Sequence, residues 1–187
     1  MVKILNIYTK GIVSANSSSF LTPIIKNKNN IENLGVKVNF FQKFSESILD
    51  CDTLVFESKL FKHAWGKNEL HKTKDFFDYV REKVKRFIFV DLSDSSSFVI
   101  NEALELVDIY FKNQIYHDRE LYSKNFYGRR IFSDFYHKKS FVTDNIPEKY
   151  KSVAKKDVRK IKLSWNSCFA NYSYIGSWMQ RIYKILP

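Results

Sequence analysis

Short apolar runs alternate along the chain with stretches that have the spacing of amphipathic helices. The runs at residues 2–8, 36–41, 53–58, 87–91, 107–111 and 161–165 predict strands that are buried on both faces. Between two of them, residues 71–87 place Phe76, Phe77, Val80 and Val84 on one face between charged residues, which predicts a helix. A further helix is expected from residue 20 to residue 34, with Gly35 at its C-terminal cap.

Strands that are separated by helices predict a single α/β domain. We expect a Rossmann-like three-layer fold with a mostly parallel sheet of about six strands. The 187 residues suit one such domain, and residues 166–187 are expected to be a hinge or linker helix. We expect neither a membrane span nor a signal peptide. The two cysteines stand far apart in the sequence, which favours a reducing compartment over a disulfide framework.

Polar side chains follow the fourth predicted strand without a gap. The strand runs into the segment DLSDSSS, which contains Asp91, Asp94 and Ser95. In open parallel sheets, ligands bind beyond the carboxyl ends of the strands. Two interpretations are open, because the cluster can cap a short helix that begins near Phe98 or can bind a polar ligand. Two acids three residues apart, without further ligand residues, do not predict a metal site.

The loop after the first strand, TKGIVSANSSSF, has a single glycine. It therefore matches neither the dinucleotide-binding fingerprint nor the Walker A loop. Its hydroxyl and amide groups can bind a polar ligand such as a sugar, and an ordinary polar loop is the alternative. The candidate ligand-binding residues of this loop are Lys10, Ser14, Asn16 and Ser17.

The net charge of +11 is concentrated in the second part of the chain. Residues 1–111 contain 15 basic and 14 acidic side chains, whereas residues 112–187 contain 16 basic and 6 acidic side chains. A one-sided basic field attracts anionic partners, which include nucleic acid, an anionic membrane surface and a phosphate-bearing substrate. A solvated basic face without a partner is the alternative.

Residues 112–137 mix aromatic rings with arginines and histidines. Aromatic faces stack on sugars or bases, and guanidinium groups bind phosphates with two hydrogen bonds. The same rings would also anchor a long segment to the sheet, so both roles stay open. The candidate ligand-binding residues of this segment are Tyr127, Arg129, Arg130, Asp134, Tyr136 and His137. We expect its histidines to be hydrogen-bonded spectators rather than general bases.

Several of these segments together carry a resemblance that spans nearly the whole chain. They are SANSSSFLTPI, CDTLVFESK, FVDLSDSSS, VDIYFKNQIYHDRELY, YGRRIFSDFYH and KIKLSWN. In this combination the chain resembles the amino-terminal half of bacterial glycosyltransferases of lipopolysaccharide and surface-polysaccharide biosynthesis. Those enzymes are similar to the GT-B class, in which two Rossmann-like domains face each other across a cleft. The first domain mainly binds the acceptor, and the second, which nothing in this chain resembles, mainly binds the nucleotide sugar.

The resemblance implies an acceptor-binding domain of a longer transferase, inactive on its own, that acts on a glycan or lipid-linked saccharide. The candidate residues of the first loop would face the cleft. One carboxylate of the acid pair would be the general base if the transfer inverts configuration. Arg129 and Arg130 would hold phosphates, while Tyr127 and Tyr136 would stack on sugars.

The resemblance also implies partners and a location. This domain would bind no cofactor, because the nucleotide-sugar donor is expected on the second domain, a partner within the same chain. It would bind no metal, because in such enzymes positive side chains and helix N-termini stabilise the departing nucleotide diphosphate. The basic second part suits an anionic membrane surface, so the protein is expected in the cytoplasm, peripheral to the inner face of the membrane. Two other classes stay open, a nucleic-acid-binding module and a non-catalytic Rossmann-like interaction module. We expect a saccharide rather than nucleic acid as the partner.

Overall fold

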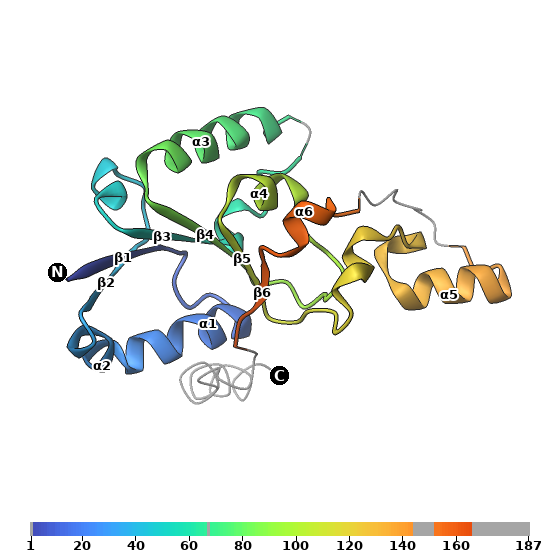
Figure 1. The fold of residues 1–187 in the computed structure, drawn as a ribbon, viewed down its shortest axis with the longest axis horizontal. Coiled ribbons are helices and arrows are strands. Elements are labelled where there is room, and N and C mark those ends of the chain that lie inside the picture. Colours follow the sequence, from blue (N-terminus) through green and yellow to red (C-terminus); the bar gives the residue numbers. More distant parts are fainter. Residues whose placement is uncertain (1, 67, 144–151, 166–187) are drawn as a thin grey trace, which may run out of the picture.

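In the part of the chain that the structure describes, a sheet of six parallel strands forms the centre of the domain (Figure 1). The structure is a computed structural model that describes residues 2–66, 68–143 and 152–165. The predicted hinge at residues 166–187 and one of the two cysteines, Cys168, lie outside the described residues.

The strand order confirms the predicted Rossmann-like α/β class. The strands are β1 (Lys3–Tyr8), β2 (Val36–Phe41), β3 (Thr53–Glu57), β4 (Arg86–Asp91), β5 (Ile109–Lys112) and β6 (Ile161–Leu163). They lie in the order β2-β1-β3-β4-β5-β6, and every neighbouring pair is parallel. The chain leaves β1 toward one edge and later crosses to β3 on the other side of β1. The topological switch point of the sheet is therefore between β1 and β3.

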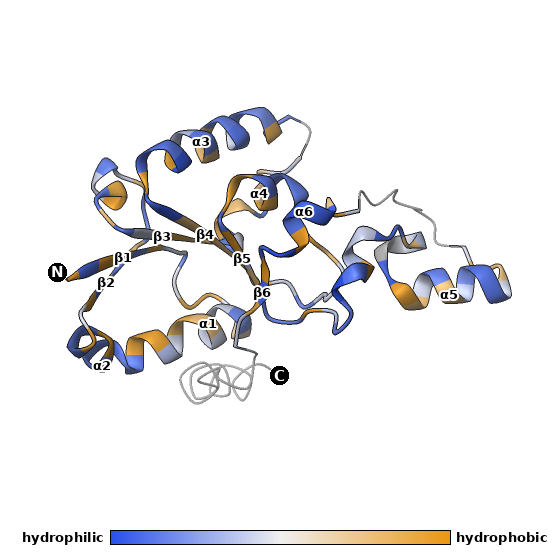
Figure 2. Ribbon diagram, in the orientation of Figure 1, coloured by the Kyte–Doolittle hydropathy of each residue, from blue (hydrophilic) through white to orange (hydrophobic). Residues whose placement is uncertain are grey.

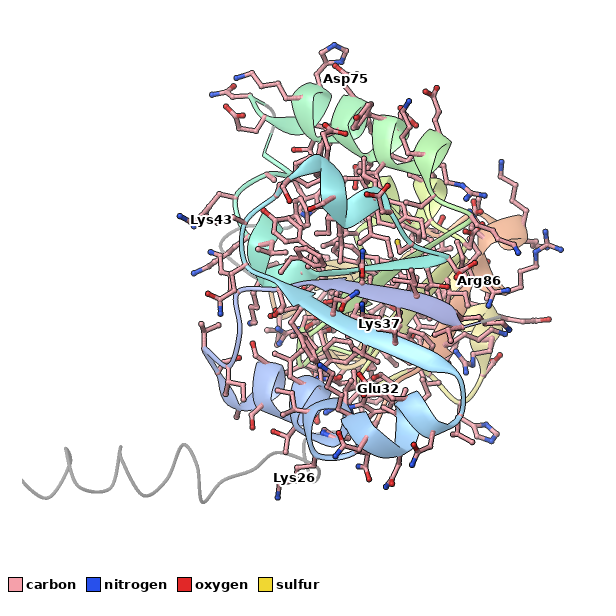
Figure 3. The ribbon with its side chains drawn as sticks, turned by 90° about the vertical axis from the view of Figure 1, so that its left-hand side faces the viewer. Lys26, Glu32, Lys37, Lys43, Asp75 and Arg86 are labelled. Atoms are coloured by element: carbon pink, nitrogen blue, oxygen red, sulfur yellow. The ribbon has the colours of Figure 1, made fainter. Side chains whose placement is uncertain are left out.

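Helices cover both faces of the sheet. The α-helices are α1 (Ala15–Lys26), α2 (Lys28–Asn33), α3 (Leu70–Lys83), α4 (Asn101–Leu106), α5 (Ile131–Ser140) and α6 (Lys155–Val158), and the 3₁₀ turns are η1 (Glu46–Leu49), η2 (Ser58–Phe61), η3 (Arg119–Ser123) and η4 (Tyr127–Arg129). Helices α1 and α2 lie on one face, and α3 and α4 lie on the other (Figures 1 and 3). Helix α5 projects away from the sheet (Figure 1).

Successive side chains of the strands enter two separate cores. On β3, Val55 packs in the core that contains Leu21 and Ile24 of α1, whereas Phe56 packs in the core that contains Phe77 of α3. This alternation is the period of an extended strand, and both sets are apolar because both faces are covered. Figure 2 shows hydrophobic residues along the strands and many hydrophilic residues along α3.

The first helix begins earlier than predicted. It starts at Ala15, and Ser14 is its N-cap, whose hydroxyl accepts a hydrogen bond from the backbone N–H of Ser17 at 3.1 Å. The serines suggested a loop in the sequence, yet Ser17, Ser18 and Ser19 are buried in the first turns of α1. Helix α1 ends at Lys26 and α2 is a separate helix, so the predicted single helix at residues 20–34 is wrong in its start and its continuity.

Candidate functional site at the carboxyl edge of the sheet

Charged side chains end three neighbouring strands at the same edge of the sheet. Glu57 is the last residue of β3, Asp91 is the last of β4, and Lys112 is the last of β5. The register places Asp91 opposite Lys112 and Glu57 opposite Val90. All three charged side chains are buried. Because isolated charges are costly in the interior, each must be paired or hydrogen-bonded.

Glu57 holds the loop between β1 and α1 against the end of β3. Its carboxylate accepts hydrogen bonds from the Thr9 hydroxyl, from the Ser17 hydroxyl at 3.0 Å and from the Lys10 backbone N–H at 3.3 Å. Burial raises the pKa of Glu57 above its ordinary value of 4.5, although the donors from Thr9, Ser17 and Lys10 oppose the shift. The predicted ligand residue Ser17 is therefore engaged with the strand edge.

Asp91 and Lys112 form a buried ion pair that spans β4 and β5. The Lys112 Nζ lies 2.6 Å from one carboxylate oxygen of Asp91, and the exposed fractions of the two residues are 0% and 1%. The Tyr110 hydroxyl donates to the same carboxylate oxygen at 3.0 Å, and the Ser93 N–H donates to the other at 2.9 Å. Lys112 also donates to the Phe98 carbonyl oxygen at 2.6 Å and to the Ser93 hydroxyl at 3.3 Å. The pair thus fastens both ends of the segment 93–98, which we name the serine loop.

The serine loop does not cap a helix. Helix α4 begins at Asn101, and its N-cap Ile100 makes no side-chain capping bond. The Ser95 hydroxyl instead accepts a hydrogen bond from the Phe98 N–H at 3.2 Å, inside the loop itself. The capping interpretation of this cluster is wrong, because the helix that follows it begins at Asn101 and has Ile100, rather than a serine or aspartate of the cluster, as its N-cap.

A hydrogen bond joins the first turn of α1 to the serine loop. The Asn16 side-chain amide donates to the Asp94 carboxylate at 2.7 Å and to the Leu92 carbonyl oxygen at 2.8 Å. Asp94 is exposed, whereas Asp91 is buried. The two acids of the predicted pair therefore differ: Asp94 faces solvent, and Asp91 makes structural contacts with both oxygens.

A second anchor for the serine loop comes from the aromatic segment after β5. The Tyr122 hydroxyl donates to the Ser96 carbonyl oxygen at 2.9 Å and accepts from the Tyr116 N–H at 3.3 Å. Tyr122 is 1% exposed, and burial raises its pKa to about 12. The side chain of Tyr122 therefore has the anchoring role that the sequence left open for the rings of residues 112–137.

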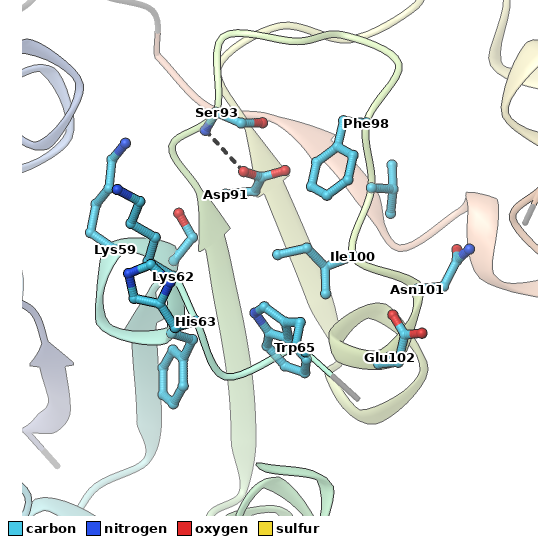
Figure 4. A pocket seen from close by; sticks show the side chains of 14 residues that line it. Lys59, Lys62, His63, Trp65, Asp91, Ser93, Phe98, Ile100, Asn101 and Glu102 are labelled. Carbon is cyan, nitrogen blue, oxygen red and sulfur yellow. Dashed lines mark hydrogen bonds between the residues drawn. The ribbon is translucent and has the colours of Figure 1, made fainter. Parts of the chain in front are cut away.

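Two cavities flank the serine loop. The serine pocket, of about 320 Å³, is lined by Asp94, Ser95, Ser96, Ser97, Gln114, Tyr116, Arg130, Ile131 and Phe132. The β3–β4 pocket, of about 650 Å³, is lined by Ser58, Lys59, Phe61, Lys62, His63, Trp65, Gly66, Asp91, Ser93, Phe98, Val99, Ile100, Asn101 and Glu102 (Figure 4). The two linings share no residue. Volumes of this size are typical of small-molecule sites.

The structure brings some of the predicted ligand residues together. Four of them come from three distant parts of the sequence: Asn16, Asp94 with Ser95, and Arg130. Asn16 donates a hydrogen bond to Asp94, and Asp94, Ser95 and Arg130 line the serine pocket. Lys10 lies in the loop between β1 and α1, and Ser14 ends that loop as the N-cap of α1. The side chain of Arg129 is not among those described.

The remaining predicted residues lie on η4 and α5. The ring of Tyr127 stacks on that of His137, with 3.7 Å between the ring centroids, and the His137 Nδ1 donates to the Val142 carbonyl oxygen at 2.9 Å. Asp134 accepts from the Tyr127 N–H at 3.0 Å and from the Lys138 ammonium at 2.6 Å, and these two donors lower the pKa of its carboxyl. Tyr136 is exposed on α5. These residues form a local cluster away from the serine loop.

The sequence interpretation missed several residues of this edge. Glu57 and Lys112 each end a buried strand, which is the signal that selected Asp91, and the same signal would have found them. Lys62 and Trp65 follow β3 in a segment without periodicity, so only the fold reveals that they line a pocket with Asp91.

We expect Asp91→Asn to lower the free energy of unfolding by about 3–5 kcal/mol, because the substitution leaves the buried Lys112 ammonium without its counter-charge. Urea unfolding would measure this loss. Asp94→Asn, the same chemical change on an exposed acid of the same loop, is the control and should cost within about 1 kcal/mol. Equal losses in the two variants would contradict the structural role of the ion pair.

We also expect the stability difference between the native protein and Glu57→Gln to depend on pH. Between 4.5 and the raised pKa of Glu57, the folded state binds more protons than the unfolded chain. The unfolding free energy of the native protein should therefore fall relative to the variant as pH rises through this window, and should then level off. Urea unfolding of both proteins at several pH values tests the sign of this change. An unfolding free energy of the native protein that rises relative to that of the variant across this pH window would refute the prediction.

Comparisons with known proteins add no assignment to this geometry. Neither a protein-family model, nor a curated protein, nor a solved structure matches the chain. Within the described residues, no three His, Cys, Asp or Glu side chains form a group that could hold a metal ion. None of the helices in the described part of the chain has the length and apolarity that a bilayer crossing requires.

Proposed function

We propose that this chain is the acceptor-binding domain of a glycosyltransferase and that it binds a saccharide in the serine pocket. The observation that carries the proposal is the meeting of Asn16, Asp94 and Arg130 at one carboxyl edge of a parallel sheet. Such an edge is where open α/β folds bind their ligands. The resemblance of the chain to the amino-terminal half of GT-B glycosyltransferases supports the same function.

The chemistry of the serine pocket suits a sugar. Its wall combines the Asp94 carboxylate, the hydroxyls of residues 95–97 and the Gln114 amide, which together bind the hydroxyl groups of a saccharide. The Phe132 ring offers an apolar face, and the Arg130 guanidinium lies 5.5 Å from the centre of that ring. A guanidinium in this place can hold a phosphate or carboxylate of the acceptor.

The two acids take different roles in this proposal. Asp94 is the carboxylate that can reach an acceptor hydroxyl, and it is the general base if the transfer inverts configuration. Asp91 keeps the serine loop in place through Lys112. The nucleotide-sugar donor would be bound by a second domain of the same chain, and no cofactor or metal is required on this one.

Helix α5 supports a further part of the proposal, docking at an anionic membrane surface in the cytoplasm. Phe132, Phe135 and Tyr136 have helical spacing on α5 and are more than half exposed, at 57%, 52% and 54%. The Lys139 ammonium lies 5.3 Å from the centre of the Phe135 ring. Aromatic rings with basic neighbours suit the interface between lipid headgroups and acyl chains. A lipid-linked acceptor would be presented at that surface.

We expect bacterial surface oligosaccharides to shift the amide NMR signals of residues 94–97, 114–116 and 130–132. Asp94→Asn and Arg130→Ala should each weaken binding about tenfold, because each removes a charged hydrogen-bonding group from the wall. Arg159→Ala, at the exposed C-cap of α6, is the control. Absence of shifts in these residues would contradict the proposal. Tighter binding of oligonucleotides, with a steep loss at higher salt, would favour the nucleic-acid-binding alternative.

Sedimentation with phosphatidylglycerol vesicles tests the membrane part separately. The double variant Phe135→Ala, Tyr136→Ala should bind these vesicles roughly tenfold more weakly, since it removes apolar area from the docking face. Ile25→Ala with Leu34→Ala, which removes exposed apolar side chains near α1 and α2, should leave binding unchanged. Equal binding by both double variants, or equal binding to phosphatidylcholine vesicles, would argue against docking through α5.

A further inference from the structure

The β3–β4 pocket has no role in the function proposed above. It lies on the other side of the serine loop from the serine pocket, and it is the larger of the two. Its floor is the end of β4 at Asp91, and its sides come from the segment after β3 and from the end of the serine loop with the start of α4 (Figure 4). It is therefore a second cavity at the edge where this fold class binds ligands.

One side of the pocket is basic. Lys59, Lys62 and His63 lie together along it, as Figure 4 shows. The positive charge of Lys59 acts on the buried Glu57. Lys62 and His63 are exposed, and neither has an ion-pair partner among the described residues. This side can therefore receive an anion from solvent.

A hydrogen-bond donor in the pocket wall lacks an acceptor. The indole nitrogen of Trp65 is buried, and no atom of the described residues accepts its hydrogen. Edge-to-face contacts hold the ring, with centroid distances of 5.3 Å to Phe77 and 6.2 Å to Phe89. In Figure 4 the nitrogen is turned toward the interior of the pocket. Buried donors are rarely left unpaired, and an oxygen of a bound ligand would satisfy this one.

The opposite side of the pocket differs in character. It presents the apolar side chains of Phe98 and Ile100, with Asn101 and Glu102 beyond them (Figure 4). An apolar wall beside an amide and a carboxylate suits a ring that carries hydroxyl groups. A ligand that fits both sides has an anionic end and a hydroxylated ring.

We infer that the β3–β4 pocket binds a phosphorylated small molecule with a hydroxylated ring, as in a sugar phosphate or a nucleotide. The phosphate lies against Lys62 and His63, which donate to its oxygens. The ring packs on Phe98, and one of its oxygens accepts the hydrogen of the Trp65 indole. Asn101 and Glu102 bind hydroxyl groups of the ring.

Titration of the full chain with glucose 1-phosphate, uridine monophosphate, inorganic phosphate and glucose tests this site. The NMR signal of the Trp65 indole N–H should shift with saturation for the first two ligands, and glucose should bind at least about tenfold more weakly than its phosphate. Whichever phosphorylated probe binds more tightly identifies the ring. No saturable shift with either, or equal affinity for glucose and its phosphate, would overturn the inference.

Variants separate this pocket from the serine pocket. Lys62→Gln with His63→Gln should weaken the phosphorylated probe about tenfold or more. Trp65→Phe keeps an aromatic ring but removes the N–H donor, and should weaken binding of the phosphorylated probe about three- to tenfold. Lys43→Gln with His71→Gln, a matched exchange on exposed residues outside both linings, should have no effect, and circular dichroism checks that each variant is folded. Unchanged binding of the phosphorylated probe by Lys62→Gln with His63→Gln would overturn the proposed site.

Asp94→Asn should not alter binding in the β3–β4 pocket, because Asp94 lines the serine pocket alone. The two proposals can therefore fail independently.

Discussion

The buried ion pair between Asp91 and Lys112 is the interaction on which the carboxyl edge of the sheet depends. An aspartate at the end of one strand and a lysine at the end of the next are forced together by the parallel register. Once buried, neither charge can be left alone. Lys112 also donates hydrogen bonds to Ser93 and Phe98, at the two ends of the serine loop. The ion pair that neutralises the two buried charges therefore also determines the path of this loop.

That path creates the two cavities of the edge. A loop that is fastened at both ends, and held at Ser96 by Tyr122, forms a wall between the serine pocket and the β3–β4 pocket. At the end of β3, the Glu57 carboxylate in the same way holds the loop between β1 and α1 and the start of α1, through the hydroxyls of Thr9 and Ser17. Asn16, in the first turn of α1, donates to Asp94 and so connects α1 to the serine loop. The buried charges are structural, and the exposed polar groups beside them are those that a ligand can meet.

The fold was largely predictable because strand burial leaves a simple pattern. Apolar runs such as that around Phe89 and Val90 indicated strands covered on both faces, and each was found close to its predicted place. The start of α1 was not, because Ser17 and its neighbours look like loop residues until their hydroxyl groups find partners in the buried edge. The site was predictable only in part. Asp94, Ser95 and Arg130 were selected for their chemistry, and they share a pocket. Trp65 became visible only through its unpaired nitrogen in three dimensions.

The state of the Lys112 ammonium group is the most direct test of this account. Its hydrogens donate to Asp91, Ser93 and Phe98 inside the protein, so they should exchange slowly with water. In a ¹⁵N NMR experiment selective for lysine ammonium groups at neutral pH, the native protein should show a protected signal that disappears in Asp91→Asn and persists in Asp94→Asn. If the ammonium hydrogens of every lysine exchange as fast as those of a free side chain, the buried Asp91–Lys112 pair does not exist. The account of the carboxyl edge that depends on this pair would then be contradicted.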